Sequence, residues 1–360
     1  MINLYGWSDA LVAAFAPYAT RGLFPARVIA HHRDLWRLVT RQGETAGRLS
    51  GRFALDAVPG DYPVVGDWLA IGGVPNSADA IIHALLPRRT VFSRQAAGGV
   101  GVGVGVQIVA ANVDVALLVA ALNGNLNLRR LERYIVAARE SGATPVIVLT
   151  KVDLSENPEE DTRRVAEVCG GAPVVTLSAL TGQGVRGLEP WLTPGRTAAL
   201  LGSSGAGKST LLNALAGRVL MDTGTIRESD DHGRHTTTHR ELFRLPGGAL
   251  LVDTPGMREF GLLADATLDE SFADVAALVP NCRFGNCTHE SEPGCAVQDA
   301  LRSGVLSAER WLAYLKLQRE IAFVVRKDDP AAEAANRTRG KQIHKAQRSK
   351  NMHRRRSEES

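Results

Sequence analysis

The sequence predicts a multidomain chain with an N-terminal β-barrel, a central α/β domain that carries a phosphate-binding loop, and a C-terminal, mainly helical domain that binds a metal. Short β-like runs separated by turns occupy residues 26–87. Apolar runs alternate with helical patterns over residues 113–261. Three cysteines and a histidine gather within residues 282–295. Each pattern is typical of a different kind of core, so we expect separate domains.

The barrel is predicted from five short runs, at residues 27–29, 35–40, 45–49, 68–71 and 80–85, with Gly-, Pro- and Asp-rich turns between them. Strands at this spacing favour a small, closed or partly open barrel. Gly and Val alternate over residues 98–105, and we interpret this run as a linker rather than a weak strand. The expected domains are an N-terminal segment of little signal at 1–30, the barrel at 31–90, the α/β domain at 98–263, the metal-binding domain at 264–330 and a basic tail at 331–360.

The α/β domain is predicted from apolar runs typical of buried parallel strands, at residues 115–120, 146–149, 174–177, 198–201 and 249–252. Helical patterns lie between them at 128–140, 159–168 and 209–216. Such alternation predicts a doubly wound sheet, whose carboxyl edge is where ligands bind.

A phosphate-binding loop follows the run 198–201. Its residues fit the pattern G-x-x-x-x-G-K-[ST] and are Gly202, Ser203, Ser204, Gly205, Ala206, Gly207, Lys208 and Ser209, with a helical run starting at Thr210. Glycines let backbone amides approach the phosphates, and Lys208 adds positive charge at the β- and γ-phosphates. The hydroxyl of Ser209 is a ligand for Mg²⁺. The strand–loop–helix context distinguishes this match from an ordinary Gly-rich turn.

Two motifs that follow other strands predict a guanine site. Thr150-Lys151-Val152-Asp153 comes after the run 146–149, and Ser178-Ala179 comes after 174–177. The Asp153 carboxylate can accept the N1–H and N2 protons of guanine, a donor pair that adenine lacks. The backbone of Ser178 and Ala179 can close over the base. Each motif alone is typical of a surface turn, but their joint place at one sheet edge favours nucleotide binding.

A fourth motif, Asp253-Thr254-Pro255-Gly256, follows the run 249–252. We expect Asp253 to hold Mg²⁺ through water and the Gly256 N–H to sense the γ-phosphate. Between Ser209 and Asp253 lies a polar stretch, 233–240, where a first switch must fall. Thr236 or Thr237 there is expected to complete the Mg²⁺ shell. A plain surface loop would have the same composition.

The order of these motifs is unusual. The base motifs at 150–153 and 178–180 precede the phosphate loop and Asp253, whereas common GTPases have them last. A cyclic shift preserves the spatial arrangement because domain termini often lie close together. We therefore predict a circularly permuted G domain, whose second switch leads directly into the Cys-rich region.

The C-terminal cluster is Cys282-x4-Cys287-x-His289-x5-Cys295. A closed set of three thiolates and one imidazole is typical of a structural Zn²⁺ site, because zinc favours such a tetrahedron. The alternative is a group of unligated side chains in a polar loop. Cys169 is interpreted as a small core residue.

The net charge of +4 gives only a mild indication of an anionic partner, but the excess is concentrated at residues 337–356. This stretch has almost no apolar residues, so we expect it to be disordered alone and to act as a tether on RNA phosphates, or else as a solubilising tail. No run approaches the ~20 apolar residues that span a bilayer. We expect a cytoplasmic monomer without membrane contact.

Several motifs together resemble one family, the small ribosomal subunit-dependent GTPase A family (RsgA/YjeQ). They are the permuted order, the Cys/His spacing, Gly233-x-His235-Thr236-Thr237, Val65-Gly66-Asp67-Trp68, Leu86-Pro87-Arg88-Arg89 and Ala111-Asn112-Val113-Asp114. The resemblance covers roughly residues 26–325. It implies an OB-fold barrel, a permuted G domain, a zinc domain, and a role in late maturation of the 30S subunit with rRNA as partner.

The resemblance also implies which residues bind each ligand. GTP contacts fall on Thr150, Lys151, Asp153, Ser178, Ala179 and residues 202–210. Zinc falls on Cys282, Cys287, His289 and Cys295. Two departures from ordinary GTPases stand out. Thr150 replaces an Asn, which loses or alters a side-chain amide contact. Met257 stands where many GTPases have a water-orienting Gln, and the resemblance suggests His235 as the substitute. A switch-loop hydrogen bond without a catalytic part is an equal alternative for His235.

Three functions remain to be distinguished besides a slow GTPase that the small subunit stimulates. They are an RNA-binding chaperone that uses GTP as a structural ligand, a permuted GTPase of the large subunit, and an ATPase. The complete Mg²⁺ and phosphate set disfavours the first, and the barrel with the zinc spacing disfavours the second. Asp153 disfavours the third.

Overall fold

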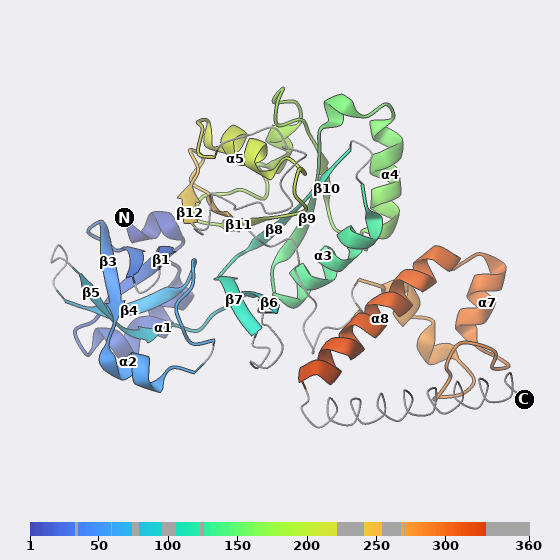
Figure 1. Cartoon of the computed structure of the whole chain (residues 1–360), viewed down its shortest axis with the longest axis horizontal. Coiled ribbons are helices and arrows are strands. Elements are labelled where there is room, and N and C mark those ends of the chain that lie inside the picture. The colour runs from blue at the N-terminus through green and yellow to red at the C-terminus, as the bar shows by residue number, and fades with distance from the viewer. Residues whose placement is uncertain are drawn as a thin grey trace, which may run out of the picture. The chain divides into compact units, whose positions relative to one another are not determined.

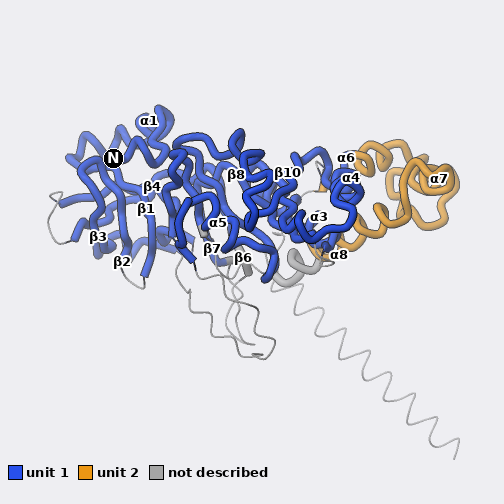
Figure 2. Tube along the Cα trace, turned by 90° about the horizontal axis from the view of Figure 1, so that it is seen from above, with its two compact units in different colours: residues 1–261, 269–273 blue, residues 262–268, 274–360 orange. Residues whose placement is uncertain are grey.

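The computed structural model describes residues 1–32, 35–58, 60–73, 79–95, 106–122, 126–221, 241–253, 268–269 and 271–328. The chain forms two compact units, which Figure 2 colours separately. The first contains residues 1–261 and 269–273, and the second contains 262–268 and 274–360.

The predicted barrel is confirmed as five strands: β1 (Phe24–His32), β2 (Leu35–Val39), β3 (Glu44–Leu49), β4 (Trp68–Gly72) and β5 (Ala80–Leu85). Their order is β1-β2-β3-β5-β4, and an additional pairing of β1 with β4 closes the ring. This is the five-stranded arrangement of an OB fold. Its core is apolar, with Val28, Leu38 and Ile82 fully buried. Helix α2 (Gly51–Asp56) connects β3 to β4 and begins with Ser50, whose hydroxyl accepts from the Phe53 N–H.

The first residues, where the sequence gives little signal, also fold. A short 3-10 helix, η1 (Ile2–Tyr5), precedes helix α1 (Asp9–Ala19). Leu11 and Phe15 are the buried side chains of α1. This helix was not predicted because apolar residues lie all around it, so that no single face is marked for burial, and because Pro17 lies inside it.

A two-stranded antiparallel sheet flanks the Gly/Val run. Its strands are β6 (Val91–Gln95) and β7 (Val106–Ala111). The predicted linker at 98–105 lies outside the described residues. The pairing of Val91 with Ala111 joins the segment before this run to the segment after it.

The predicted doubly wound sheet is confirmed, with strands β8 (Val115–Ala121), β9 (Thr144–Thr150), β10 (Val174–Thr176), β11 (Thr197–Leu201), β12 (Glu241–Arg244) and β13 (Leu250–Asp253). The order is β10-β9-β8-β11-β13-β12, with β12 antiparallel and the other pairings parallel. All five expected apolar runs overlap these strands, and only the runs 174–177 and 249–252 extend beyond them, by one residue each. The parallel pairing brings their carboxyl ends to one edge.

Helices cover both faces of this sheet (Figure 1). Helix α3 (Leu128–Glu140) and helix α4 (Pro158–Val168) lie on one side, and α5 (Lys208–Ala216) lies on the other. Leu211 and Leu212 of α5 pack with alternate residues of β8 and β9 in the main core. The side chain of Asn127 caps α3 by accepting from the Arg130 N–H. The phosphate-loop motif therefore lies between a buried strand and a helix that buries one face in the core.

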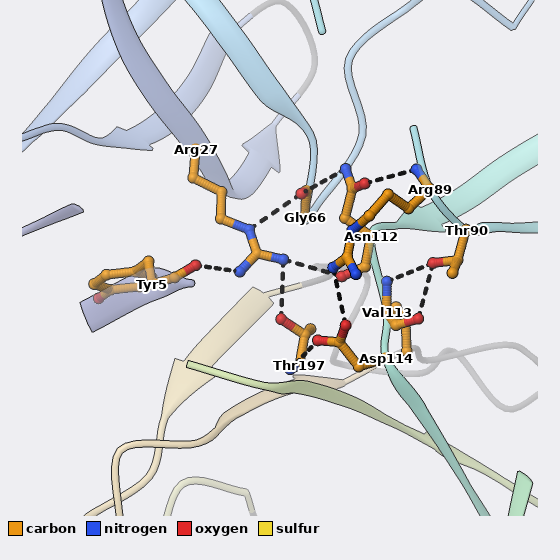
Figure 3. A network of polar contacts seen from close by, with 9 residues as sticks. All are labelled: Tyr5, Arg27, Gly66, Arg89, Thr90, Asn112, Val113, Asp114 and Thr197. Atoms are coloured by element: carbon orange, nitrogen blue, oxygen red, sulfur yellow. Dashed lines mark hydrogen bonds and ion pairs between the residues drawn. The ribbon is translucent and has the colours of Figure 1, made fainter. Parts of the chain in front are cut away.

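A buried arginine joins the barrel to the G domain. Arg27 of β1 donates to the carbonyls of Tyr5 (2.5 Å), Gly66 (3.1 Å) and Asn112 (3.2 Å) and to the Thr197 hydroxyl (2.9 Å) (Figure 3). Burial lowers the pKa of Arg27 to about 10, and the nearby Asp114 carboxylate acts in the opposite direction. The guanidinium therefore stays charged at neutral pH. Because Thr197 begins β11, this network fixes the barrel to the strand that leads into the phosphate loop.

The segment between the two domains is fixed on both sides by consecutive arginines. Arg88 forms a buried ion pair with Asp67 of the barrel, at 2.7 Å. The backbone N–H of Arg89 donates to the Asn112 side chain, and its guanidinium donates to Asp114 (2.9 Å). The sheets also meet directly, because Ala30 of β1 pairs with Glu241 of β12. The barrel and the G domain thus form one compact unit.

Replacement of Arg27 by Met should lower the stability of this unit by about 3 kcal/mol, because buried acceptors lose their donor. Exposed Arg48, which pairs with Asp79 on the barrel surface, is the matched control. Arg48→Met should cost less than about 1 kcal/mol. Urea unfolding at pH 7 measures both, and equal midpoints for the two variants would contradict the role of Arg27.

The second unit is mainly helical, as predicted. Its elements are α6 (Ala273–Ala276, whose first residue belongs to the first unit), η5 (Val279–Asn281), α7 (Ala296–Ser303) and α8 (Ala308–Asp328). Val297 of α7 is fully buried, and Trp311 of α8 is nearly so. The Cys-rich loop lies between η5 and α7.

Candidate nucleotide and metal sites

The predicted nucleotide motifs lie at one edge of the sheet. Thr150 ends β9, Ser178 comes two residues after β10, Gly202 directly follows β11, and Asp253 ends β13. These strands are parallel, so the residues that follow them share the carboxyl edge. Asp253 is paired with Glu241 through its backbone. Predicted residues His235, Thr236, Thr237, Gly256 and Met257 lie outside the described residues.

The phosphate loop has a backbone shape that requires glycine. Gly202, Gly205 and Gly207 have φ values of +154°, +74° and +89°. A Cβ on Gly202 would lie 2.3 Å from the Val119 carbonyl oxygen, so the loop begins in close contact with the end of β8. Gly207 precedes the first residue of α5. The helix N-terminus, with its unpaired amides, is thereby directed to the sheet edge.

Lys208 lies over its own loop. Its Nζ donates to the carbonyls of Gly202 (2.8 Å) and Ser203 (2.7 Å). These bonds hold the ammonium group against the backbone of the loop. A phosphate bound there would contact both the backbone amides and the positive charge of Lys208. Ser209 and Thr210 lie in the first turn of α5 and are half-buried.

The base motif differs from expectation in one contact. Thr150 is nearly fully buried, and its hydroxyl donates to the Ala206 carbonyl of the phosphate loop at 2.6 Å. Lys151 has a left-handed backbone (φ 60°), which turns the chain sharply after β9. Asp153 is exposed. The Val152 N–H donates to the carbonyl of Leu177, so the two base motifs are joined.

Ser178 shapes the second base loop. It is fully buried; its N–H donates to the Gln183 carbonyl (2.9 Å), and its own carbonyl accepts from Gly182 (2.9 Å). Its hydroxyl accepts from the Thr181 N–H. These bonds form a closed loop on which Ala179 packs against the core and Leu180 is exposed.

The predicted metal ligands are brought together. One donor atom from each of Cys282, Cys287, His289 and Cys295 lies within 4.8 Å of the others. Sγ of Cys282 is 3.9 Å from Sγ of Cys295, and His289 Nδ1 is 3.5 Å from each of these sulfurs. A tetrahedral site with zinc bonds of about 2.3 Å to sulfur and 2.0 Å to nitrogen separates two sulfurs by about 3.8 Å and sulfur from nitrogen by about 3.5 Å. The geometry therefore fits a tetrahedral metal ion.

Side chains around the cluster hold the ligand loop. Glu292 accepts from the backbone N–H groups of Thr288, Glu290 and Ser291, and hydrogen bonds from Thr288 lower the pKa of Glu292 to about 2. Gln298 donates to the His289 carbonyl at 2.6 Å. The His289 ring packs edge-on against Trp311 at 5.6 Å. Glu292 and Gln298 thus hold the backbone of the ligand loop, and Trp311 packs against the imidazole ring.

Three functional contacts were missed from the sequence: the Arg27 network, the Thr150–Ala206 bond and the Glu292 turn. Arg27 bonds to Thr197, which lies 170 residues away in the sequence, and Thr150 bonds to Ala206, which lies 56 residues away. No local sequence pattern spans such separations. Glu292 had a usable signal, because a carboxylate within a Thr-His-Glu-Ser-Glu run is a common partner for turn amides.

Comparisons with known proteins agree with this fold. Residues 85–263 match the family model described as RsgA GTPase, and residues 197–343 match one described as 50S ribosome-binding GTPase. An Opitutus terrae protein named small ribosomal subunit biogenesis GTPase RsgA is 46% identical and covers 97% of each chain. A Methanosarcina acetivorans protein of that name is 42% identical over 90% of this chain and 86% of its own.

Two solved structures share the fold. YjeQ from Thermotoga maritima superposes with a TM-score of 0.63 at 25% identity, covering 83% of this chain and 99% of that one. YloQ, described as a circularly permuted GTPase, superposes with a TM-score of 0.60 at 22% identity, covering 83% and 95%. The order of motifs in the present sheet is likewise permuted. The chain therefore belongs to the RsgA family and is a GTPase.

Proposed function

We propose that this GTPase acts in biogenesis of the small ribosomal subunit. The supporting observation is the 46% identity to the Opitutus protein of that name over 97% of both chains, which includes the barrel, the G domain and the Cys cluster. GTP and GDP are the proposed nucleotides, and the 30S subunit with its rRNA is the proposed partner. We propose a monomer, in which the α/β domain, the metal-binding domain and the tail have the boundaries predicted above and the barrel begins at β1. In the part of the chain that the structure describes, no helix is long and apolar enough to cross a membrane.

The proposed chemistry assigns a task to each predicted nucleotide motif, including those outside the described residues. Amides of residues 202–210 bind the phosphates, and Lys208 stabilises the charge that develops in phosphoryl transfer. Ser209, Thr236 or Thr237, and Asp253 are the proposed holders of Mg²⁺, which supplies further charge neutralisation when bound. His235 is the proposed residue that orients water. Lys151, Val152, Asp153, Ser178 and Ala179 form the proposed base site, and Gly256 the γ-phosphate contact.

Zinc is the proposed ion of the Cys/His cluster. The thiol and imidazole donors are those that Zn²⁺ prefers, and four protein ligands leave no open position. A structural task follows, in which the ion orders the loop between η5 and α7.

Base selectivity is tested at Asp153. Asp153→Asn should weaken GDP binding by about 100-fold and shift preference to xanthine nucleotides, because the amide offers a donor where guanine also offers one. Exposed Asp56 on α2 is the control, and Asp56→Asn should bind GDP like the wild type. Titration calorimetry with GDP, XDP and ADP measures this. Wild-type binding of ADP as tight as that of GDP would refute the assignment.

The basic tail is tested by truncation after Asn336. Its cations are Arg337, Arg339, Lys341, Lys345, Arg348, Lys350, Arg354, Arg355 and Arg356. Loss of phosphate contacts should weaken 30S binding and flatten its dependence on salt, because fewer counterions are released. Basal hydrolysis should stay unchanged. The test measures 30S affinity of both proteins at 50, 100 and 200 mM salt. Equal affinities with equal salt slopes would assign RNA binding to the barrel and the zinc domain alone.

The deciding experiment for the function is GTP turnover alone, with purified 30S subunits and with purified 50S subunits. Stimulation by 30S alone is the expected result. Stimulation by 50S instead would favour large-subunit assembly, in line with the description of the second matching family model. Tight GTP binding without turnover in any mixture would favour an RNA-binding chaperone.

A further inference from the structure

The Thr150 hydroxyl joins the base motif to the phosphate loop. It lies 2.6 Å from the Ala206 carbonyl oxygen and 3.3 Å from that of Ala120. Carbonyl oxygens only accept, so the hydroxyl donates, and its single proton goes to the nearer oxygen, that of Ala206. Thr150 is 1% exposed, so water does not compete for this proton. The side chain is thus occupied inside the protein.

This bond sets the orientation of the peptide between Ala206 and Gly207. The chain has no cis peptide among the described residues, and a trans peptide directs its C=O and N–H to opposite sides. With the Ala206 oxygen held inward, the Gly207 N–H faces outward from the sheet edge. A Cβ on Gly207 would lie 3.4 Å from the Thr150 oxygen, so the loop packs directly on this hydroxyl. Outward amides before a helix are the groups that bind phosphate.

We propose that Thr150 is a positioning residue, which sets the 206–207 peptide for phosphate binding and makes no contact with guanine. This inference rests on the proposed assignment of residues 202–209 to the phosphates. An amide side chain at this position carries two donor protons and can serve loop and base together. The threonine hydroxyl has one donor proton, and it donates this proton to the Ala206 carbonyl. The contribution of Thr150 to nucleotide affinity therefore depends on the phosphates of the nucleotide and not on its base.

The test compares Thr150→Val, which removes the hydroxyl at nearly constant shape, with Thr150→Ser, which keeps it. Thr150→Val should bind GDP about 10-fold more weakly, as expected when a buried carbonyl loses its donor, and Thr150→Ser should recover most of that loss. The penalty should fall below about 2-fold for GMP, which lacks the β-phosphate that the loop binds. Thr144→Val, at the exposed start of β9, is the control and should bind like the wild type.

Base analogues separate positioning from contact. GDP, 7-deaza-GDP and 6-thio-GDP differ only at the acceptor atoms of guanine, so the Thr150→Val penalty should be the same for all three. A penalty that vanishes with either analogue would show a base contact and overturn the proposal. So would unchanged GDP affinity in a folded Thr150→Val protein. If the Thr150→Val protein does not fold, the Thr150→Ala protein, which also lacks the hydroxyl, is measured in its place. Absence of any GDP binding by the wild type would instead refute the nucleotide assignment.

Discussion

Replacement of Cys287 by Ser should abolish stoichiometric metal binding and unfold the second compact unit. Structural Zn²⁺ sites contribute about 10–16 kcal/mol of apparent binding energy, and the ligand loop between η5 and α7 has little apolar core of its own. Without the ion, the three thiols and the imidazole, whose donor atoms lie within 4.8 Å of one another, lose the bonds that would join them. Metal analysis of the wild type should give about one Zn²⁺ per chain. Hydrogen exchange should show lost protection in residues 274–328 alone.

Cys169 is the matched control for this variant, because it is a buried thiol outside the cluster, and its single S–H proton is within hydrogen-bond distance of the carbonyls of Ala166 and Ala172. Cys169→Ser should keep the metal and the protection of the second unit. A wild-type protein stripped of metal that keeps full protection in residues 274–328 would show that the cluster is not structural.

Lys208→Ala should lower kcat by about 10³-fold, or about 4 kcal/mol of transition-state stabilisation. Phosphoryl transfer depends on positioned positive charge, and the Lys208 ammonium is held over the loop by the carbonyls of Gly202 and Ser203. GDP affinity should also weaken, because the same charge meets the β-phosphate. Single-turnover hydrolysis separates the chemical step from binding.

Lys316 provides the control for Lys208. It is an exposed lysine on α8, so Lys316→Ala should leave both kcat and GDP affinity unchanged. Turnover of Lys208→Ala at the wild-type rate would mean that the loop does not act on the γ-phosphate. A loss in both lysine variants would point to general destabilisation, which thermal melting would reveal.

The strands and the ligand cluster were predictable because their signals are local. An apolar run of four to six residues marks each parallel strand, and the predicted helix 128–140 matches α3 to the residue. The four metal ligands lie within one short segment whose spacing is itself the evidence. The barrel, likewise, follows from short runs separated by turns.

Contacts between distant segments were not predictable. Arg27 looked like an ordinary residue of a barrel strand, yet four acceptors from four parts of the chain surround its guanidinium. Thr150 was predicted as a nucleotide contact, and that role stays a prediction that the proposed test addresses. Helix α1 was missed because packing against the barrel, rather than amphipathic sequence, holds it.

The order of strands in the long sheet has a consequence for synthesis. The barrel and strands β8, β9 and β10 emerge from the ribosome first, so the guanine half of the edge can form while the phosphate half is still untranslated. Strand β12 arrives last but one and pairs with β1 across more than 200 residues, as Ala30 and Glu241 show. The nascent barrel thus offers a ready template for it. Since β13 completes the edge, the proposed GTP site of a nascent chain is complete only after Asp253 has left the exit tunnel.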